Sequence, residues 1–166
     1  MDLVRAVVNL QAFHQPSQKL HILFVGSGAL GAELRHACEV VFDAEGTSTR
    51  TEPTNAPRPR ASFAGFLNQT EISRAYVAAD CLVLASDYGE TWGLVVNEAL
   101  ASGLPCIVSD ACGCAEDLCG DGVFPLGDIS SLASRLLEAY NRKIKLVAPP
   151  TYQGTVDSVV RAYSEI

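Results

Sequence analysis

The chain has 166 residues, of which 48% are apolar and 19% charged, so it is suited to one folded domain and too short for two full ones. Its 12 Lys and Arg residues against 19 Asp and Glu give a net charge of −7, which argues against nucleic-acid partners and anionic membranes. The apolar runs are strand-sized and no secretory signal is recognisable, so we expect a cytoplasmic protein without a membrane span.

The first third of the chain predicts helices and strands that alternate. Helical spacing of apolar residues predicts a helix over Asp2–His14, and the apolar run Leu20–Val25, ended by a glycine, predicts a strand buried on both faces. Helical periodicity returns over Ala29–Phe42. Residues Gly46–Arg60 combine Thr, Pro and Arg without a period and are predicted to form an exposed loop.

The alternation continues to the end of the chain, with Asn68, partnered by Glu71, and Asp128 as expected helix caps. Strands that alternate with helices favour parallel pairing, so the predicted class is α/β, an open parallel sheet with helices on both faces. Ligands of such sheets bind beyond the carboxyl ends of the strands. The further predicted strands are Ser62–Ala64, Cys81–Ala85, Pro105–Val108 and Val123–Phe124, and the helices are Gln69–Ala79, Gly93–Ser102, Ile129–Asn141 and Thr155–Ser164.

A glycine-rich turn follows the first predicted strand. Gly26, Gly28 and Gly31 form a GxGxxG pattern that opens a helix, where the backbone can approach a pyrophosphate and the helix N-terminus favours an anion. A dinucleotide site also needs an acidic residue at the end of the next strand, whereas Asp43 and Glu45 end a predicted helix. The alternatives are an NAD site, as in an NAD-dependent oxidoreductase, and a tight turn that requires small residues.

A second candidate site begins where the strand Cys81–Ala85 ends. Glu90 lies on a loop at the carboxyl edge of the sheet. The residues that follow, Thr91, Trp92 and Gly93, are expected to present free backbone N–H groups at the start of a helix. An anion is favoured at such a position, so this loop predicts a pocket for a diphosphate.

Glu98 lies on the same helix, whose other members are nearly all apolar. An ionised carboxylate in such surroundings is costly unless it is hydrogen-bonded, and a ligand hydroxyl would satisfy it. Glu90 and Glu98 at one cleft can accept hydrogen bonds from a polyol such as a sugar or ribose. The alternative is structural, with Glu98 paired to an Arg or Lys and Glu90 solvated on its loop.

At this segment the sequence resembles the retaining, GT-B-type glycosyltransferases of group 1, glycosyltransferase family 4. The resemblance extends over most of the chain from Met1 to Ser164, apart from the Gly46–Arg60 loop. The carboxyl-terminal domains of that family carry an E-x7-E pattern followed by E-A-x-A-x-G-x-P, which is matched here by Glu90, Glu98, Ala99, Ala101, Gly103 and Pro105.

The resemblance implies a Rossmann-like half of a GT-B fold that binds a nucleoside-diphosphate sugar of the UDP or GDP type, with no cofactor and no metal. Glu90 would be the catalytic residue, in contact with the transferred sugar, and Glu98 would hold the nucleotide ribose. The sugar and diphosphate would be contacted by Thr91, Trp92, Gly93 and Leu94. The nucleobase would lie by Phe66 and Leu67, and the close turn at Gly26 and Gly28 would lie near the donor.

Two departures from the family pattern shape these expectations. Thr91-Trp92 stands where the family has Gly-Phe or a similar pair, which would alter the sugar pocket. Compared with the family, the chain starts after a strand and an Arg/Lys-bearing loop, and it lacks the N-terminal acceptor-binding domain. We therefore expect residues 1–166 to be a single domain, the carboxyl-terminal half of a hexosyltransferase-type enzyme, inactive alone and membrane-associated only through the missing half.

Other readings of the sequence are less specific. A third possibility for the function is a nucleotide-binding or interaction module that keeps the fold without turnover. The last four cysteines of the chain match no usual zinc spacing, and a cytosolic domain with its own core needs no bridges. We expect free thiols at all six positions, which are Cys38, Cys81, Cys106, Cys112, Cys114 and Cys119.

Overall fold

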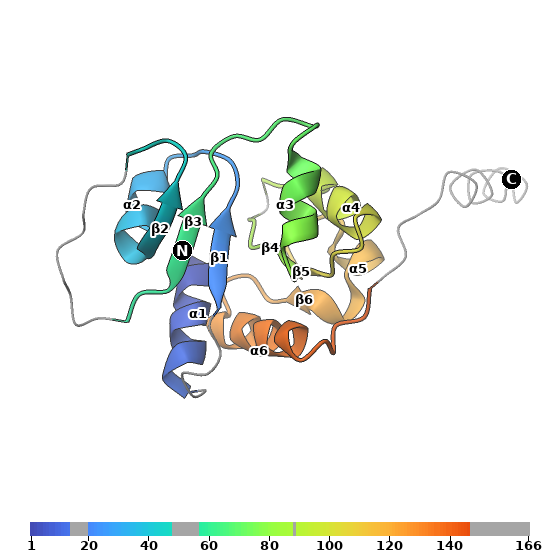
Figure 1. Cartoon of the computed structure of the whole chain (residues 1–166). Helices are drawn as coiled ribbons and strands as arrows, with labels where there is room; N and C mark the ends of the chain where they lie inside the picture. Colours follow the sequence, from blue (N-terminus) through green and yellow to red (C-terminus); the bar gives the residue numbers. More distant parts are fainter. Residues whose placement is uncertain (14–19, 48–56, 88, 147–166) are drawn as a thin grey trace, which may run out of the picture.

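The structure is a computed structural model that describes residues 1–13, 20–47, 57–87 and 89–146. Helices and parallel strands alternate along it, which confirms the predicted α/β class (Figure 1). None of the helices in these ranges has the length and apolar character needed to cross a membrane. In chain order the elements are α1 (Asp2–Phe13), β1 (His21–Phe24), α2 (Gly31–Ala37), β2 (Glu39–Asp43), β3 (Arg60–Phe63), α3 (Ile72–Ala78), β4 (Leu82–Leu84), α4 (Leu94–Ala101), β5 (Cys106–Ser109), α5 (Ala115–Leu118), the 3₁₀ helix η1 (Gly120–Gly122), β6 (Val123–Phe124) and α6 (Ile129–Tyr140).

The strands form two parallel sheets of three strands each, in the orders β1-β3-β2 and β4-β5-β6, rather than the single sheet that the sequence predicted. Among the described residues no ladder joins β1 to β4. The prediction that β1 is buried on both faces is also wrong. Ile22 is buried in the core, whereas Leu23, on the opposite face, is 39% exposed.

The predicted helix Ala29–Phe42 is wrong in its second half. Helix α2 ends at Ala37, and the chain turns at Cys38 into the strand β2, which pairs with β3. Val40, Val41 and Phe42 are β-branched or aromatic residues that suit a strand, but no glycine or proline separates them from the helix. Asp43 therefore closes a strand and not a helix.

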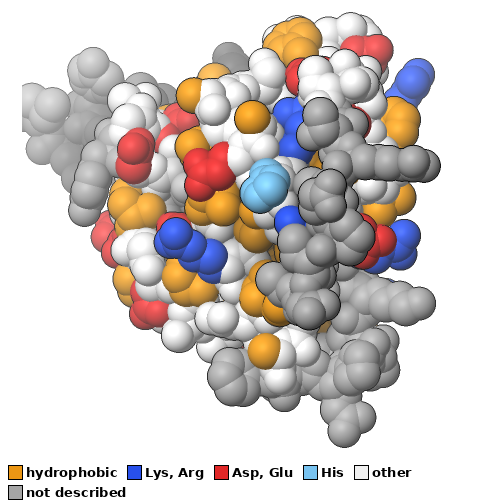
Figure 2. Space-filling view, turned by 90° about the vertical axis from the view of Figure 1, so that its left-hand side faces the viewer, with side chains coloured by type: hydrophobic (Ala, Val, Ile, Leu, Met, Phe, Trp, Pro, Cys, Tyr) orange, Lys and Arg blue, Asp and Glu red, His pale blue; other side chains and the backbone are white. Residues whose placement is uncertain are grey.

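Strand β2 lies at the edge of its sheet, next to α2 (Figure 1). Figure 2 shows this side of the molecule, where acidic, basic and apolar side chains are interspersed among the coloured residues. Val41 and Phe42 are 48% and 58% exposed. This side therefore presents a mixed surface in which neither sign of charge forms a continuous patch among the described residues.

The expected helix cap at Asp128 is present, whereas the N-cap of α3 is Glu71, which makes no side-chain cap hydrogen bond, and not the predicted Asn68. Asp128 accepts a hydrogen bond from the Ser131 amide at 2.9 Å, at the start of α6. Asn68 accepts one from the Thr70 amide at 2.9 Å while its own amide donates to Glu71 at 3.2 Å. Regular helix begins only at Ile72, so α3 is shorter than predicted. The predicted helical stretch 155–164 lies outside the described residues.

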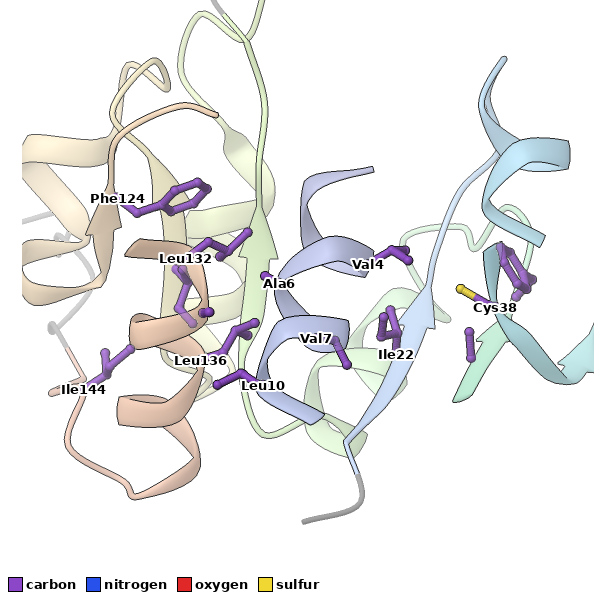
Figure 3. Close-up of a cluster of buried hydrophobic side chains, with 14 residues drawn as sticks. Val4, Ala6, Val7, Leu10, Ile22, Cys38, Phe124, Leu132, Leu136 and Ile144 are labelled. Carbon is purple, nitrogen blue, oxygen red and sulfur yellow. The ribbon is translucent and has the colours of Figure 1, made fainter. Parts of the chain in front are cut away.

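Helices α1 and α6 join the two sheets through one buried cluster (Figure 3). Val7 of α1 points towards Ile22 of β1, and Leu10 of the same helix points towards Leu136 of α6. Phe124 of β6 belongs to the same cluster. The first and last described helices thus share one core with strands from both sheets.

A second buried cluster lies among α3, α4, α5 and the strand β5. It contains Tyr76 of α3, Val96 and Leu100 of α4 and four thiols from the segment 106–119. All six cysteines of the chain are free thiols. No group of three or more His, Cys, Asp or Glu side chains in the described part of the chain is arranged to hold a metal ion. This second core supports the loop and helix that carry the candidate site.

Candidate functional site

Glu90 lies on the loop that leads into α4, and its side chain binds backbone amides directly before the helix. Its Oε1 accepts a hydrogen bond from the Gly93 amide at 2.9 Å and a longer one from the Trp92 amide at 3.4 Å. The expectation that these two amides are free is therefore wrong, and so is the alternative of a merely solvated Glu90. The amide of Leu94, the first residue of α4, donates to none of the described residues.

Two glycines allow the chain to pack closely at the Glu90 loop, one within the loop and one in a later segment that packs against it. Gly93 has a φ of 92°, a left-handed conformation that side chains disfavour, and a Cβ there would lie 3.2 Å from the Cys114 Sγ. A Cβ on Gly113 would lie 2.0 Å from the Thr91 carbonyl oxygen. The Cys114 amide also donates to the Trp92 carbonyl at 3.0 Å. The segment 113–114 therefore braces the site loop, a role that the sequence did not predict.

Trp92 is held against the first turns of α4. Its indole Nε1 donates to the Asn97 Oδ1 at 2.9 Å, and the residue is 39% exposed. A partly exposed ring with a fixed orientation offers a flat apolar surface beside the Glu90 loop. Asn97 was not among the predicted site residues.

Glu98 is exposed, so the argument that it is buried among apolar residues is wrong. Its Oε2 accepts a hydrogen bond from the Tyr76 hydroxyl at 2.8 Å. Among the described residues it forms no ion pair with Arg or Lys, which removes the predicted structural alternative in that part of the chain. Tyr76, 22 positions earlier on another helix, was missed because only tertiary packing brings it to Glu98.

Tyr76 is a hydrogen-bond donor over the whole ordinary pH range. The residue is only 6% exposed, and this burial, followed by its hydrogen bond to Glu98 and the negative charge there, raises the pKa of the phenol well above its usual value. The Glu98 carboxylate is thus held by a neutral donor. Leu94, one helical turn before Glu98, is 70% exposed, so both side chains lie on an accessible face of α4.

The glycine turn after β1 is tied to the turn after β3. The Gly26 amide donates to the Gly65 carbonyl at 2.7 Å, directly before the predicted nucleobase residues Phe66 and Leu67. Phe66 is 79% exposed, and a Cβ on Gly28 would meet no atom within 4 Å. The structure thus brings the predicted glycine turn and the predicted nucleobase residues together. No hydrogen bond between described residues joins this group to Glu90 or Glu98.

Asp43 ends β2, the position at which a dinucleotide site requires an acidic residue, which corrects the earlier placement in a helix. Both carboxylate oxygens accept from Arg35, at 2.8 and 3.0 Å, and the Asp43 side chain is only 4% exposed. Arg35 also bridges to Glu45 and lies over the Phe63 ring. Its hydrogen bond to Asp43 is the largest cause that raises the pKa of Arg35. This carboxylate is engaged inside the fold and is poorly placed to bind a ribose.

Comparison with known proteins favours a glycosyltransferase over an NAD-dependent oxidoreductase. The family model described as glycosyl transferases group 1 matches residues 2–142. A sulfoquinovosyl transferase of Arabidopsis thaliana is 37% identical over 82 residues, which cover 46% of this chain and 16% of that protein. An uncharacterized glycosyltransferase of Methanocaldococcus jannaschii is 39% identical over 59 residues, which cover 36% of this chain and 15% of that protein. With a family match over most of its length, this chain belongs to the group 1 glycosyltransferases.

Proposed function

We propose that this chain is the donor-binding domain of a retaining glycosyltransferase of the hexosyltransferase type. It binds a nucleoside-diphosphate sugar, and the whole enzyme transfers the sugar to an acceptor hydroxyl with its anomeric configuration kept. The observation that carries this proposal is the position of two carboxylates along α4. Glu90 lies at the N-terminus of the helix, and Glu98 is exposed one turn beyond Leu94.

The N-terminus of α4 is suited to the diphosphate. Backbone amides and the helix dipole favour negative charge there, and the Leu94 amide has no partner among the described residues. The Gly93 amide donates its hydrogen bond to Glu90 in the free chain, and the Glu90 carboxylate would repel a phosphate at the same position. We infer that Glu90 leaves the amide when the donor binds and accepts hydrogen bonds from the sugar hydroxyls instead, while a phosphate oxygen takes its place.

The remaining contacts follow from the positions of the exposed side chains. Glu98 accepts hydrogen bonds from the ribose, and the exposed ring of Phe66 lies by the nucleobase. The backbone of Thr91, Trp92 and Gly93 faces the sugar and the diphosphate. No metal ion is needed in this proposal, because the backbone amides at the N-terminus of α4 stabilise part of the negative charge of the phosphates.

A further domain completes the enzyme in this proposal. The chain aligns with only 16% and 15% of the lengths of the two relatives. We propose that the other domain supplies the acceptor site and the cations that neutralise the departing nucleoside diphosphate. Nucleotide binding by the chain alone is then weak, and sugar transfer by it alone is not expected.

The proposal is tested by titrating UDP and GDP against the chain and against Glu98→Ala in a calorimeter. We expect one of the two nucleotides to bind and Glu98→Ala to weaken that binding by about tenfold, the loss of a hydrogen bond to a charged group. Glu39→Ala is the matched control, because Glu39 is also an exposed glutamate but lies at the amino end of β2. Equal affinities of the chain and Glu98→Ala would remove Glu98 from the site, and no binding of either nucleotide would overturn the proposal.

A further inference from the structure

The hydrogen bond between Tyr76 and Glu98 reaches from the second core to the surface. The Tyr76 ring belongs to that core and is only 6% exposed, whereas Glu98 is exposed on α4. Their oxygens are 2.8 Å apart, with the hydroxyl as donor. A buried ring in a fixed position therefore holds an accessible carboxylate by one of its two oxygens.

The other carboxylate oxygen of Glu98 is left for a ligand. Oε2 receives the Tyr76 hydroxyl, while Oε1 accepts no hydrogen bond from any side chain or backbone group of the described residues. A glutamate side chain has three rotatable bonds, and anchoring one oxygen restricts the directions in which the second can point. The conformational entropy of this side chain is then already lost in the free chain, so ligand binding does not have to restrict it further.

We propose that Tyr76 is a positioning residue that fixes Glu98 so that its Oε1 meets the vicinal hydroxyls of a ribose. This inference rests on the proposed function and adds to it a residue on α3 that sets the preference of the site for ribonucleotides. Tyr76 itself does not touch the nucleotide. It acts through the direction and rigidity of the Glu98 carboxylate.

The competing explanation is that the bond only fastens α3 to α4. Both roles are compatible with a 2.8 Å hydrogen bond, but they differ in what its removal changes. A fastening role affects the folded fraction, and thereby every ligand by the same factor. A positioning role affects only ligands that carry the hydroxyls that Glu98 binds.

The test replaces Tyr76 by phenylalanine, which keeps the packed ring and removes only the hydroxyl. UDP, GDP and their 2′,3′-dideoxy counterparts are titrated against the chain, Tyr76→Phe, Glu98→Ala and a double variant with both changes. Tyr140→Phe is the matched control, because Tyr140 is 48% exposed on α6. The ratio of ribonucleotide to dideoxynucleotide affinity is the decisive quantity, since partial unfolding cancels in it.

We expect Tyr76→Phe to weaken ribonucleotide binding by about threefold to tenfold and to leave dideoxynucleotide binding unchanged. Adding Tyr76→Phe to Glu98→Ala should cause no further loss, because the two residues act as one unit. An unchanged ratio in Tyr76→Phe, together with a reduced ratio in Glu98→Ala, would overturn the positioning role and leave the proposed function standing. If neither Tyr76→Phe nor Glu98→Ala lowered the ratio of ribonucleotide to dideoxynucleotide affinity, both the positioning role and the proposed function would be overturned. The same holds if the chain bound no nucleotide.

Discussion

Substituting Gly113 with alanine tests whether the Glu90 loop is part of a nucleotide site. The added Cβ would lie 2.0 Å from the Thr91 carbonyl oxygen, and separations under 3.0 Å essentially do not occur for real Cβ atoms. The loop or the segment that braces it must therefore shift by at least 1.0 Å, the difference between these two distances. The contacted atom is backbone, so no rotation of a side chain relieves the clash.

Such a shift has two separable costs. Moving the Thr91 carbonyl strains the 3.0 Å bond between the Cys114 amide and the Trp92 carbonyl, and we expect a loss of stability of about 2 to 4 kcal/mol from overpacking and a weakened hydrogen bond. The same shift displaces the Trp92 and Gly93 amides, which donate to Glu90 in the free chain and which a diphosphate would use. We expect nucleotide affinity to fall by about tenfold or more, because polar contacts tolerate little misplacement.

The assay combines UDP and GDP titrations with urea denaturation of Gly113→Ala. Gly122→Ala is the control, since its Cβ would lie 2.1 Å from the Cys106 carbonyl oxygen and away from the site loop. We expect Gly122→Ala to lose comparable stability while its folded form binds nucleotide within about twofold of the parent. If folded Gly113→Ala bound as tightly as the parent, the loop 90–94 would have no part in nucleotide binding.

Three further predictions concern the ion pair at β2, the buried thiols and the absence of a metal requirement. Arg35→Gln should lower the free energy of unfolding by about 2 to 3 kcal/mol in urea, because it leaves the nearly buried Asp43 carboxylate without its bidentate partner; an unchanged midpoint would contradict this. Burial raises the pKa of Cys106 and of Cys119 to about 12, so the folded state keeps these protons while the unfolded chain releases them near pH 8.5, and stability should fall as the pH rises above that value towards 12. Urea denaturation of the parent and of Cys106→Ala at pH 7.5 and pH 10 checks this. The loss of unfolding free energy between the two pH values should be smaller in the variant. EDTA should leave nucleotide affinity unchanged, and an affinity restored by Mg²⁺ after EDTA treatment would refute the metal-free proposal.

Elements with strong local signals could be predicted closely. Helix α6 begins directly after Asp128, whose side chain caps it, and the short strand Val123–Phe124 is found as expected. Strand β2 was missed because residues 39–43 follow a helix without a break, and the choice between helix and strand is made by the ladder to β3. Local propensity cannot decide such a case, since the pairing partner lies far along the chain.

The candidate site shows the same division. The position of Glu90 on a loop followed from the end of the predicted strand before it, and that of Glu98 from the predicted helix, whereas the groups that bind their carboxylates did not follow from the sequence. Glu90 binds amides that we expected to be free, and Glu98 binds Tyr76 from a helix that precedes β4. A carboxylate has several possible hydrogen-bond donors in any sequence, and only the tertiary packing of the chain decides which of them lies next to it.

The two cores differ in how far along the chain their members lie. The cluster that supports the site draws its fully buried members from Tyr76 to Cys119, whereas the cluster shared by α1 and α6 extends from Val4 to Ile144. Contacts between nearby segments form faster and at lower entropic cost than contacts between distant ones. During synthesis on the ribosome, the core beneath Glu90 and Glu98 can therefore assemble while α6 is still being translated, whereas the core of α1 forms only after α6 has emerged.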